Sequence, residues 1–583
     1  MNAAHTEITV AQPIRPSFPL TVLYGLFGIV LALILWHNNG RFVYTGDDPY
    51  IHLALAENIA RGHYGINLDE YSAPSSSIIW PYLLAPFATL SFGDLVPLLI
   101  NTLATTITVW LTSKIFGFLG EGAQSPRWPF SVTVVVSLLI LVLVGPAFSG
   151  MEHSLQVLLS TTVLFGLVRS LMQERVNWWF VLAVVAGPLV RYENLAFAVP
   201  AVLYLFYRRK YLVALLCMIG IAVPLLSFSL YLNSLGLGYF ATSILVKSDI
   251  VRSRGSITAI FANAWSNIFT LGGPLLYVTL GFVTKAALSS RRHFNDRLLA
   301  TFISCAVLLH VCGGKFGRYG YEVYVSYPAL IAAVYLYRNS WREIVGSRKT
   351  LVGSAVIATL LTIQYLASPL VVPLAASNVF EQQYQMHRFV TDYYRVPVAV
   401  NDLGWVSYRN DEYVLDLWGL GSTEVFRRRT IERPSHWTES LARDHGVKLV
   451  MVYPSLWRDL PESWVKVGEL QLGNVRIGAP YRTVGFFVTD DAALHAVIPL
   501  LEEFRRTLPG KVRFSFGGSV GSRVPTIPEA RASPVASGRH RPSSLCSCSS
   551  RLRKVPEVLY HPFEICVHVH AVGSCHEEKT SPG

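Results

Sequence analysis

The chain has 583 residues, of which 52% are hydrophobic and only 15% are charged. A soluble protein of this size carries about 25% charged residues, so the composition excludes an ordinary soluble enzyme and predicts a polytopic membrane protein. The net charge of +12 is attributed to basic cytoplasmic loops, and no nucleic-acid partner is expected.

Eleven apolar segments are candidates for transmembrane helices, because a span needs about 20 apolar residues and fewer where neighbouring helices shield it. The first segment is followed by Asn and Gly rather than by a small-residue cleavage site, which indicates a retained span and not a signal peptide. The segments are 20–36, 95–113, 129–147, 153–171, 177–190, 194–207, 211–231, 262–284, 297–312, 323–338 and 350–372.

Basic residues gather in five of the loops between these segments. With eleven spans and a cytoplasmic N-terminus, all five clusters fall inside, as the positive-inside rule requires. We therefore expect the remaining polar loops to meet on the extracytoplasmic face and to form one site there. These loops are 47–77, 145–153, 191–193, the segment around Lys247, and 313–319.

The loop after the first apolar segment carries two adjacent carboxylates, Asp47 and Asp48. Carboxylates at a bilayer face are costly and are found mainly where they bind ions or take part in chemistry. Asp48 precedes Pro49, so one carboxylate is explained as the N-cap of a helix with proline at its first position. That helix is expected to lie along the membrane surface. His52, one turn after Asp48, either faces the same cavity or is an interface histidine.

The composition changes after residue 372, and residues 380–508 are predicted to form an extracytoplasmic α/β domain. Ser435 is expected to cap a helix that stops at Gly446. Buried strands are expected at 396–400, 447–452 and 484–489.

Three regions are therefore predicted, with residues 1–375 forming the all-α transmembrane domain and 380–508 the α/β domain. Residues 511–583 are rich in Ser, Pro and Arg and have the composition of a disordered tail.

Several motifs occur in an order that resembles the GT-C superfamily of integral-membrane glycosyltransferases, which use polyprenyl-phosphate-linked sugars. The likeness covers about residues 20–500. It departs from the family pattern at Pro49, where a small residue is commoner, and at 53–55, where a basic residue is usual. The motifs are Asp47-Asp48-Pro49-Tyr50-Ile51, Ser149-Gly150-Met151-Glu152, Arg191-Tyr192-Glu193, the loop from Tyr239 to Lys247-Ser248, Gly317-Arg318-Tyr319, 398–404 and 415–420.

The resemblance implies that Asp47 is the general base that removes the acceptor's hydroxyl proton. Asp48 then positions Asp47, caps the helix or binds a metal. The family does not require a metal, since some members bind a divalent cation and others do not. If one is bound here, Asp47 and Asp48 are its expected ligands.

The resemblance also implies a set of substrate-binding residues. Lys247, Arg318 and Arg191 are candidates for the donor phosphate, because arginine offers a bidentate fork and lysine a point charge. Arg191 is alternatively paired with Glu193 or Glu152. Tyr319 stacks on a sugar or belongs to the aromatic belt. The predicted substrate-binding residues are His52, Glu152, Arg191, Glu193, Lys247, Arg318 and Tyr319.

The expected function is inverting transfer of a sugar from a polyprenyl-phosphate donor to a cell-envelope glycan, glycolipid or protein at the bacterial inner membrane. A lipid or sugar transporter or flippase is the main alternative, but transporters usually carry charges near mid-membrane and internal repeats. A structural scaffold and transfer of a whole oligosaccharide are further alternatives. The last is favoured only by the triplet Asp48-Pro49-Tyr50.

Overall fold

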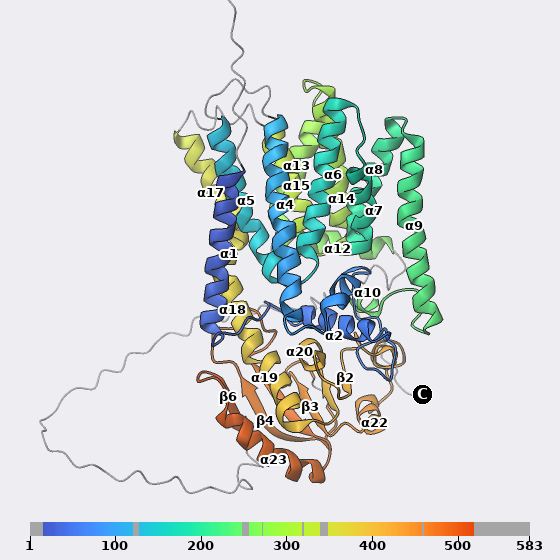
Figure 1. Cartoon of the computed structure of the whole chain (residues 1–583), viewed down its shortest axis with the longest axis vertical. Helices are drawn as coiled ribbons and strands as arrows, with labels where there is room; N and C mark the ends of the chain where they lie inside the picture. Colours follow the sequence, from blue (N-terminus) through green and yellow to red (C-terminus); the bar gives the residue numbers. More distant parts are fainter. Residues whose placement is uncertain are drawn as a thin grey trace, which may run out of the picture. The chain divides into compact units, whose positions relative to one another are not determined.

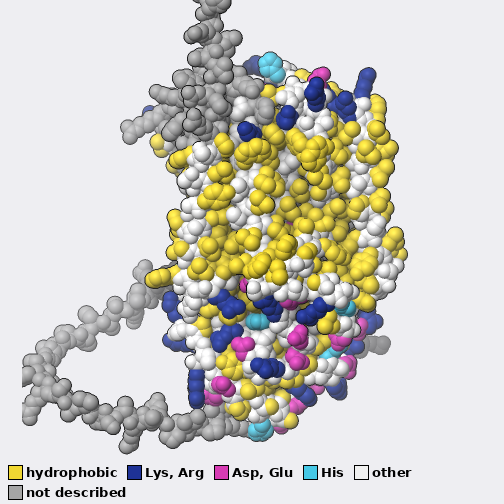
Figure 2. Space-filling model, viewed as in Figure 1, with side chains coloured by type: hydrophobic (Ala, Val, Ile, Leu, Met, Phe, Trp, Pro, Cys, Tyr) yellow, Lys and Arg dark blue, Asp and Glu magenta, His cyan; other side chains and the backbone are white. Residues whose placement is uncertain are grey.

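The computed structural model describes residues 16–119, 128–247, 256–270, 272–316, 320–337, 348–457 and 460–517. The described residues belong to one compact unit. This unit contains a helical bundle and a sheet domain, which we define as residues 380–517 (Figure 1). Hydrophobic side chains cover the bundle on the face drawn in Figure 2, whereas Lys, Arg, Asp and Glu concentrate at its ends and over the sheet domain.

Six helical segments in the described part of the chain are long and apolar enough to cross a membrane, so the protein is a multi-pass membrane protein. They are α1 (Ser17–His37), α4 (Val96–Leu119), α6 (His153–Gln173), α9 (Tyr211–Ser234), α14 (Phe294–Gly313) and the run Thr359–Tyr394, which joins parts of α17 (Arg348–Leu366) and α18 (Ser368–Glu381) to α19 (Gln383–Arg388) and the turn 389–394.

The predicted number of eleven spans is not confirmed. The segment predicted as one span at 262–284 is two helices, α12 (Ile257–Ile268) and α13 (Gly273–Leu288), bent by 103°. As one broken span this pair would make seven. The other predicted segments are helical but shorter in their apolar part: α5 (Trp128–Phe148), α7 (Trp178–Val190), α8 (Leu195–Tyr207) and α15 (Val323–Leu336).

Helix α2 (Asp48–Ala60) lies between the helical bundle and the sheet domain, together with α10 (Thr242–Lys247) (Figure 1). The side chains from Pro49 to Asn58 are all buried. Protein therefore covers α2 along this stretch, while its expected position along the membrane surface stays a prediction.

The predicted N-cap of α2 is wrong. Asp48 is the first helical residue, and Asp47 stands at the N-cap position without making a side-chain capping bond. The physical reason is that the Asp47 carboxylate is bound by the sheet domain instead. The segment after Ile78 forms only short helices, α3 (Trp80–Leu84) and the turns Ala85–Phe87 and Gly93–Leu95.

The sheet domain contains one six-stranded mixed sheet in the order β2-β1-β3-β5-β4-β6. Strands β2, β1 and β3 are parallel, and the other neighbours are antiparallel. The carboxyl ends of the three parallel strands therefore lie at one edge. The strands are β1 (Val398–Val400), β2 (Val414–Asp416), β3 (Leu449–Val452), β4 (Val465–Gln471), β5 (Thr483–Val488) and β6 (Arg513–Phe516).

The sheet extends past the predicted domain boundary at 508, because β6 pairs with β4. A strand of four residues gives too short a pattern to separate it from the tail that follows. Residues 518–583, which hold the rest of the predicted disordered tail, lie outside the described residues.

Helices pack around this sheet: α20 (Gly404–Ser407), α21 (Thr423–Phe426), α22 (Trp437–Asp444) and α23 (Asp491–Arg506). The Asp490 side chain caps α23 by accepting from the Ala493 amide at 2.8 Å. In α22 the predicted cap is wrong, because His436 and not Ser435 stands at the N-cap position and makes no side-chain capping bond. The core is apolar and includes Ala399, Leu415, Leu441, Val450, Val452, Trp464 and Phe487.

Candidate functional site

Asp47 lies where the first polar loop meets the sheet domain. Its two carboxylate oxygens accept hydrogen bonds from the backbone amides of Gly404 at 2.6 Å and Trp405 at 2.9 Å. The ring of Trp405 stacks on Tyr50 of α2 with 3.9 Å between the ring centroids. The candidate base is therefore held by two segments more than 350 residues apart in the chain.

Gly404 permits this approach because it has no side chain. A Cβ atom on Gly404 would lie 2.1 Å from the Asp47 carbonyl oxygen and 2.9 Å from its carboxylate carbon. Any other residue would push the loop and the sheet domain apart.

Gly404→Ala is expected to destabilise the protein by about 1–3 kcal/mol, the usual cost of forcing extra atoms into a packed contact. Thermal unfolding of the purified protein in detergent would measure the loss. Gly281→Ala in α13 is the matched control, since nothing lies within 4 Å of a Cβ at that position. Equal melting temperatures for the two variants would contradict the close contact at Asp47.

Asp402 brings a third carboxylate to this junction. It follows β1 and accepts hydrogen bonds from Gln383 Nε2 at 2.6 Å, from Asn401 Nδ2 at 3.0 Å and from the Tyr453 hydroxyl. The charge of Asp48 acts on Asp402, and the charge of Asp402 acts on Asp47. We call Asp47, Asp48 and Asp402 the carboxylate cluster.

Burial raises the pKa of Asp47 well above its ordinary value, and the charge of Asp402 raises it further. The hydrogen bonds from the backbone amides of Trp405 and Gly404 act in the opposite direction and lower it. A carboxylate offers about four lone-pair positions, so two remain for a substrate hydroxyl after the amides are bound. A raised pKa makes Asp47 a stronger base. In the described part of the chain, no three His, Cys, Asp or Glu side chains are arranged to hold a metal ion.

A second group of charged residues is formed by Glu152, Arg191 and Glu193, which we call the ion-pair cluster. Arg191 donates to Glu193 through Nε at 3.2 Å and Nη2 at 2.8 Å, and to Glu152 through Nη1 at 2.7 Å. Glu152 is fully buried and Arg191 is 5% exposed. A further bond runs from Arg191 to Ser76 Oγ at 3.3 Å. Four N–H groups of the guanidinium therefore have protein partners.

His52, one turn after Asp48 on α2, lies beside the ion-pair cluster. Its Nδ1 is 3.1 Å from Ser75 Oγ, and its Nε2 is 3.9 Å from Glu152 Oε2. The Ser75 hydroxyl donates to the Ser77 carbonyl at 2.7 Å, so the proton between Ser75 and His52 belongs to Nδ1. The remaining nitrogen of His52 then faces the buried carboxylate of Glu152.

The turn between α5 and α6 packs against the start of α2 and brings Glu152 there. Gly150 has φ of +72°, and a Cβ at this position would lie 2.7 Å from Pro49 and from the Tyr44 ring. Both the backbone conformation and the close approach require glycine.

Three predicted substrate-binding residues remain, and the structure does not describe their side chains. Lys247 is the last residue of α10, and its side chain lies outside the described part, as do Arg318 and Tyr319. The backbone of α10 is next to the serine-rich segment 72–77, since the Ser243 amide donates to the Ala73 carbonyl at 3.5 Å.

Sequence reasoning assigned no role to Asp402, Gly404 or Trp405, although it included 398–404 among the motifs. A usable signal was present, because polar residues directly after a parallel strand lie at the edge where α/β sheets bind ligands. Asp402 follows β1, Asp416 ends β2 and Tyr453 follows β3.

The loop between α2 and α3 also binds the sheet domain. Asn67 exchanges hydrogen bonds with the backbone of Val414 in β2 at 3.1 and 2.9 Å, and it donates to Glu70 at 3.3 Å. Burial raises the pKa of Glu70 to about 7, and the hydrogen bond from Asn67 opposes this rise.

A raised carboxyl pKa means that folding disfavours the ionised form. The stability linked to Glu70 is therefore complete below its ordinary pKa near 4.5 and is lost as the pH rises towards about 7. Glu70→Gln is expected to remove this loss, which amounts to at most about 3 kcal/mol. The stability of the variant relative to wild type should therefore increase between about pH 5 and about pH 8. Melting temperatures across that range would test it. The exposed Glu503→Gln serves as control, and parallel curves for both variants would contradict the assignment.

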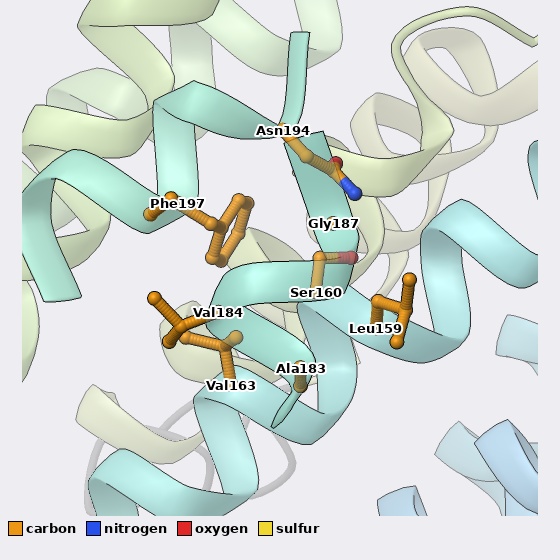
Figure 3. Close-up of a pocket in the computed structure, with 9 residues that line it drawn as sticks. Leu159, Ser160, Val163, Ala183, Val184, Gly187, Asn194 and Phe197 are labelled. Carbon is orange, nitrogen blue, oxygen red and sulfur yellow. The ribbon is translucent and has the colours of Figure 1, made fainter. Parts of the chain in front are cut away.

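A small cavity lies between α6, α7 and α8 and is lined by Ser160, Gly187 and Asn194 among others (Figure 3). Its volume of about 10 Å³ is that of one water molecule, so it is too small for a sugar or lipid. The Asn194 amide is buried and has no partner among the described residues, and a single water there would satisfy it.

Residues 377–489 match a family described as a domain of unknown function (DUF8728). No curated protein matches the chain. Among solved structures, the chain is similar to the oligosaccharyltransferase of Archaeoglobus fulgidus in complex with Zn and sulfate, with a TM-score of 0.43, 10% identity and coverage of 80% of this chain and 72% of that chain. It is also similar to ArnT from Cupriavidus metallidurans bound to undecaprenyl phosphate, with a TM-score of 0.39, 13% identity and coverage of 81% and 98%. With TM-scores below 0.5, these similarities do not decide the fold or function of this chain.

Proposed function

We propose that the protein is a GT-C-type membrane glycosyltransferase that transfers a sugar from a polyprenyl-phosphate donor to a cell-envelope acceptor on the extracytoplasmic side. The observation that carries the proposal is the position of Asp47. It is a half-buried carboxylate with a raised pKa, at the junction between an apolar helical bundle and a polar domain. A lipid-linked donor and a polar acceptor can both reach such a junction.

In the proposed reaction, the acceptor hydroxyl attacks the anomeric carbon of the sugar, and the bond from that carbon to the phosphate oxygen breaks. Asp47 takes the hydroxyl proton, and polyprenyl phosphate leaves with the bonding electrons. Attack opposite the leaving group inverts the anomeric centre. Asp48 and Asp402 keep the negative charge density around Asp47 high, which favours proton uptake.

The contacts of Arg191 favour a positioning role over phosphate binding. Its guanidinium is held by Glu152, Glu193 and Ser76, so it fixes the turns that carry them. We assign the donor phosphate to Lys247 and Arg318, which would stabilise the charge on the leaving group. His52 faces Glu152 and adds a polar side chain to the site.

The test is donor consumption by the purified full-length protein in nanodiscs. A panel of polyprenyl-phosphate sugars is supplied with an extract of cell-envelope glycans, and donors and products are followed by mass spectrometry. We expect one donor to be consumed and a glycosylated product to form. Asp69→Asn, a change at an exposed carboxylate of the same loop, should leave the rate unchanged. Movement of intact donor across proteoliposomes without any product would contradict transfer and favour a flippase.

A further inference from the structure

A cavity of about 450 Å³ lies at the end of α1 and is separate from the carboxylate cluster. It is lined by residues that follow α1, by α18 and α19, and by the segment after α23. Its polar lining consists of Asn38, Asn39, Arg41, Tyr384, Gln385, Arg388 and Thr507. Two arginines and no aspartate or glutamate line it, so the cavity is suited to an anion.

Neutral groups and the exposed carboxylate of Asp392 hold the two arginines in place. The Arg41 guanidinium lies 4.4 Å from the centre of the Tyr384 ring, and no carboxylate in the described part is within ion-pair distance of it. Arg388 donates to Gln385 at 2.8 Å and to Thr507 Oγ1 at 3.1 Å, and its Nε is 3.8 Å from Asp392. Asp392 offsets part of one charge, and the cavity keeps a net positive charge.

The location of the cavity indicates the source of the anion. Asn38 directly follows α1, the apolar helix that ends at His37, so the cavity opens at the level where lipid headgroups meet water. Figure 2 shows Lys and Arg side chains gathered just beyond the hydrophobic band on the side of the sheet domain. Basic pockets at this depth recognise anionic headgroups.

We infer that this cavity binds the phosphate of an anionic phospholipid headgroup, with Arg41 and Arg388 forming charge-assisted bonds to the phosphate. Tyr384 links the cavity to the candidate active site, because its ring contacts Trp405 with 5.0 Å between centroids. Trp405 in turn donates to Asp47. The bound lipid therefore braces the junction between bundle and sheet domain.

The test uses the full-length protein with phosphatidylglycerol as the probe. Retained lipid is counted by native mass spectrometry, and melting temperature is measured in nanodiscs of phosphatidylcholine with and without phosphatidylglycerol. We expect the wild type to retain the anionic lipid and to melt higher in its presence. Arg41→Gln with Arg388→Gln should weaken retention about tenfold or more, since each cation near a headgroup contributes about 1 kcal/mol.

The control is Arg433→Gln with Arg443→Gln, which makes the same change in net charge at two exposed positions of the sheet domain. Retention of lipid by this control, together with loss in the cavity variants, supports the site. Equal loss in both double variants would overturn it in favour of unspecific surface attraction. If inorganic phosphate displaced the lipid and alone raised the melting temperature as much, the headgroup assignment would be overturned in favour of a soluble phosphate.

Discussion

Asp47→Asn is expected to lower the rate of sugar transfer by about 10²–10⁴, the range that a positioned general base contributes. The asparagine amide cannot take up the proton of the acceptor hydroxyl. Its oxygen can still accept from one of the two amides at Gly404 and Trp405, so the fold should survive with a smaller loss of stability. Initial rates with the donor found in the panel would measure the effect, well below the melting temperature of the variant.

A purely structural role of Asp47 must be separated from the catalytic one. Asp416→Asn is a matched change, because the Asp416 carboxylate is also buried and accepts from the backbone amides of Trp418, Leu420 and Gly421 at 2.8, 2.5 and 2.7 Å. This variant should lose stability but keep the rate of the folded fraction. If Asp47→Asn lowered the rate no more than Asp416→Asn does, the assignment of the base would be wrong.

The pH profile gives the same prediction a second readout. Since the pKa of Asp47 is raised by burial and then by Asp402, transfer should fall as the pH is lowered through that raised value, where the base becomes protonated. Asp402→Asn removes a neighbouring negative charge and should move this fall to lower pH. An unchanged profile in Asp402→Asn would contradict the coupling within the carboxylate cluster.

Arg191→Ala is expected to destabilise the protein by about 3–5 kcal/mol, the usual cost of removing one member of a buried ion pair. The change leaves the fully buried Glu152 without its cation and leaves Glu193 without its bidentate partner. Arg191→Lys keeps the charge but not the planar fork, so its loss should be smaller. Thermal unfolding in detergent would rank the variants.

Arg427→Ala is the control for this prediction. Arg427 and Glu424 form an ion pair at 2.6 Å, but the Arg427 side chain is 51% exposed. Exposed pairs contribute little to stability, so the control should melt close to wild type. A melting temperature for Arg191→Ala as high as that of Arg427→Ala would exclude the buried cluster as the element that holds these turns together.

The apolar segments were predictable because the signal for a buried helix is local. A run of apolar residues must avoid water wherever it lies, and the polar residues that interrupt it mark its ends. The strands at 396–400, 447–452 and 484–489 were found for the same reason and correspond to β1, β3 and β5. Strands β2, β4 and β6 were missed. Strands β2 and β6 have only three and four residues, and β4 mixes Lys466, Glu469 and Gln471 with its apolar residues.

The candidate site was predictable only in part. The unusual pair Asp47-Asp48 and the sequence Arg191-Tyr192-Glu193 stood out as charges in an apolar chain, and the pairing of Arg191 with Glu152 and Glu193 was one of two alternatives. Asp402 did not stand out, since a carboxylate in a polar domain is ordinary.

The sequence by itself determined which segments are apolar helices and which loop carries the adjacent carboxylates. These properties depend on residues that are neighbours in the chain. Only the tertiary structure decided that 262–284 is two bent helices, that α2 is enclosed by protein, and that Asp47 is bound by Gly404 and Trp405. The physical reason is that such contacts depend on shape and on free backbone amides brought together by folding, and a carboxylate in the sequence carries no mark of the distant amide that will bind it.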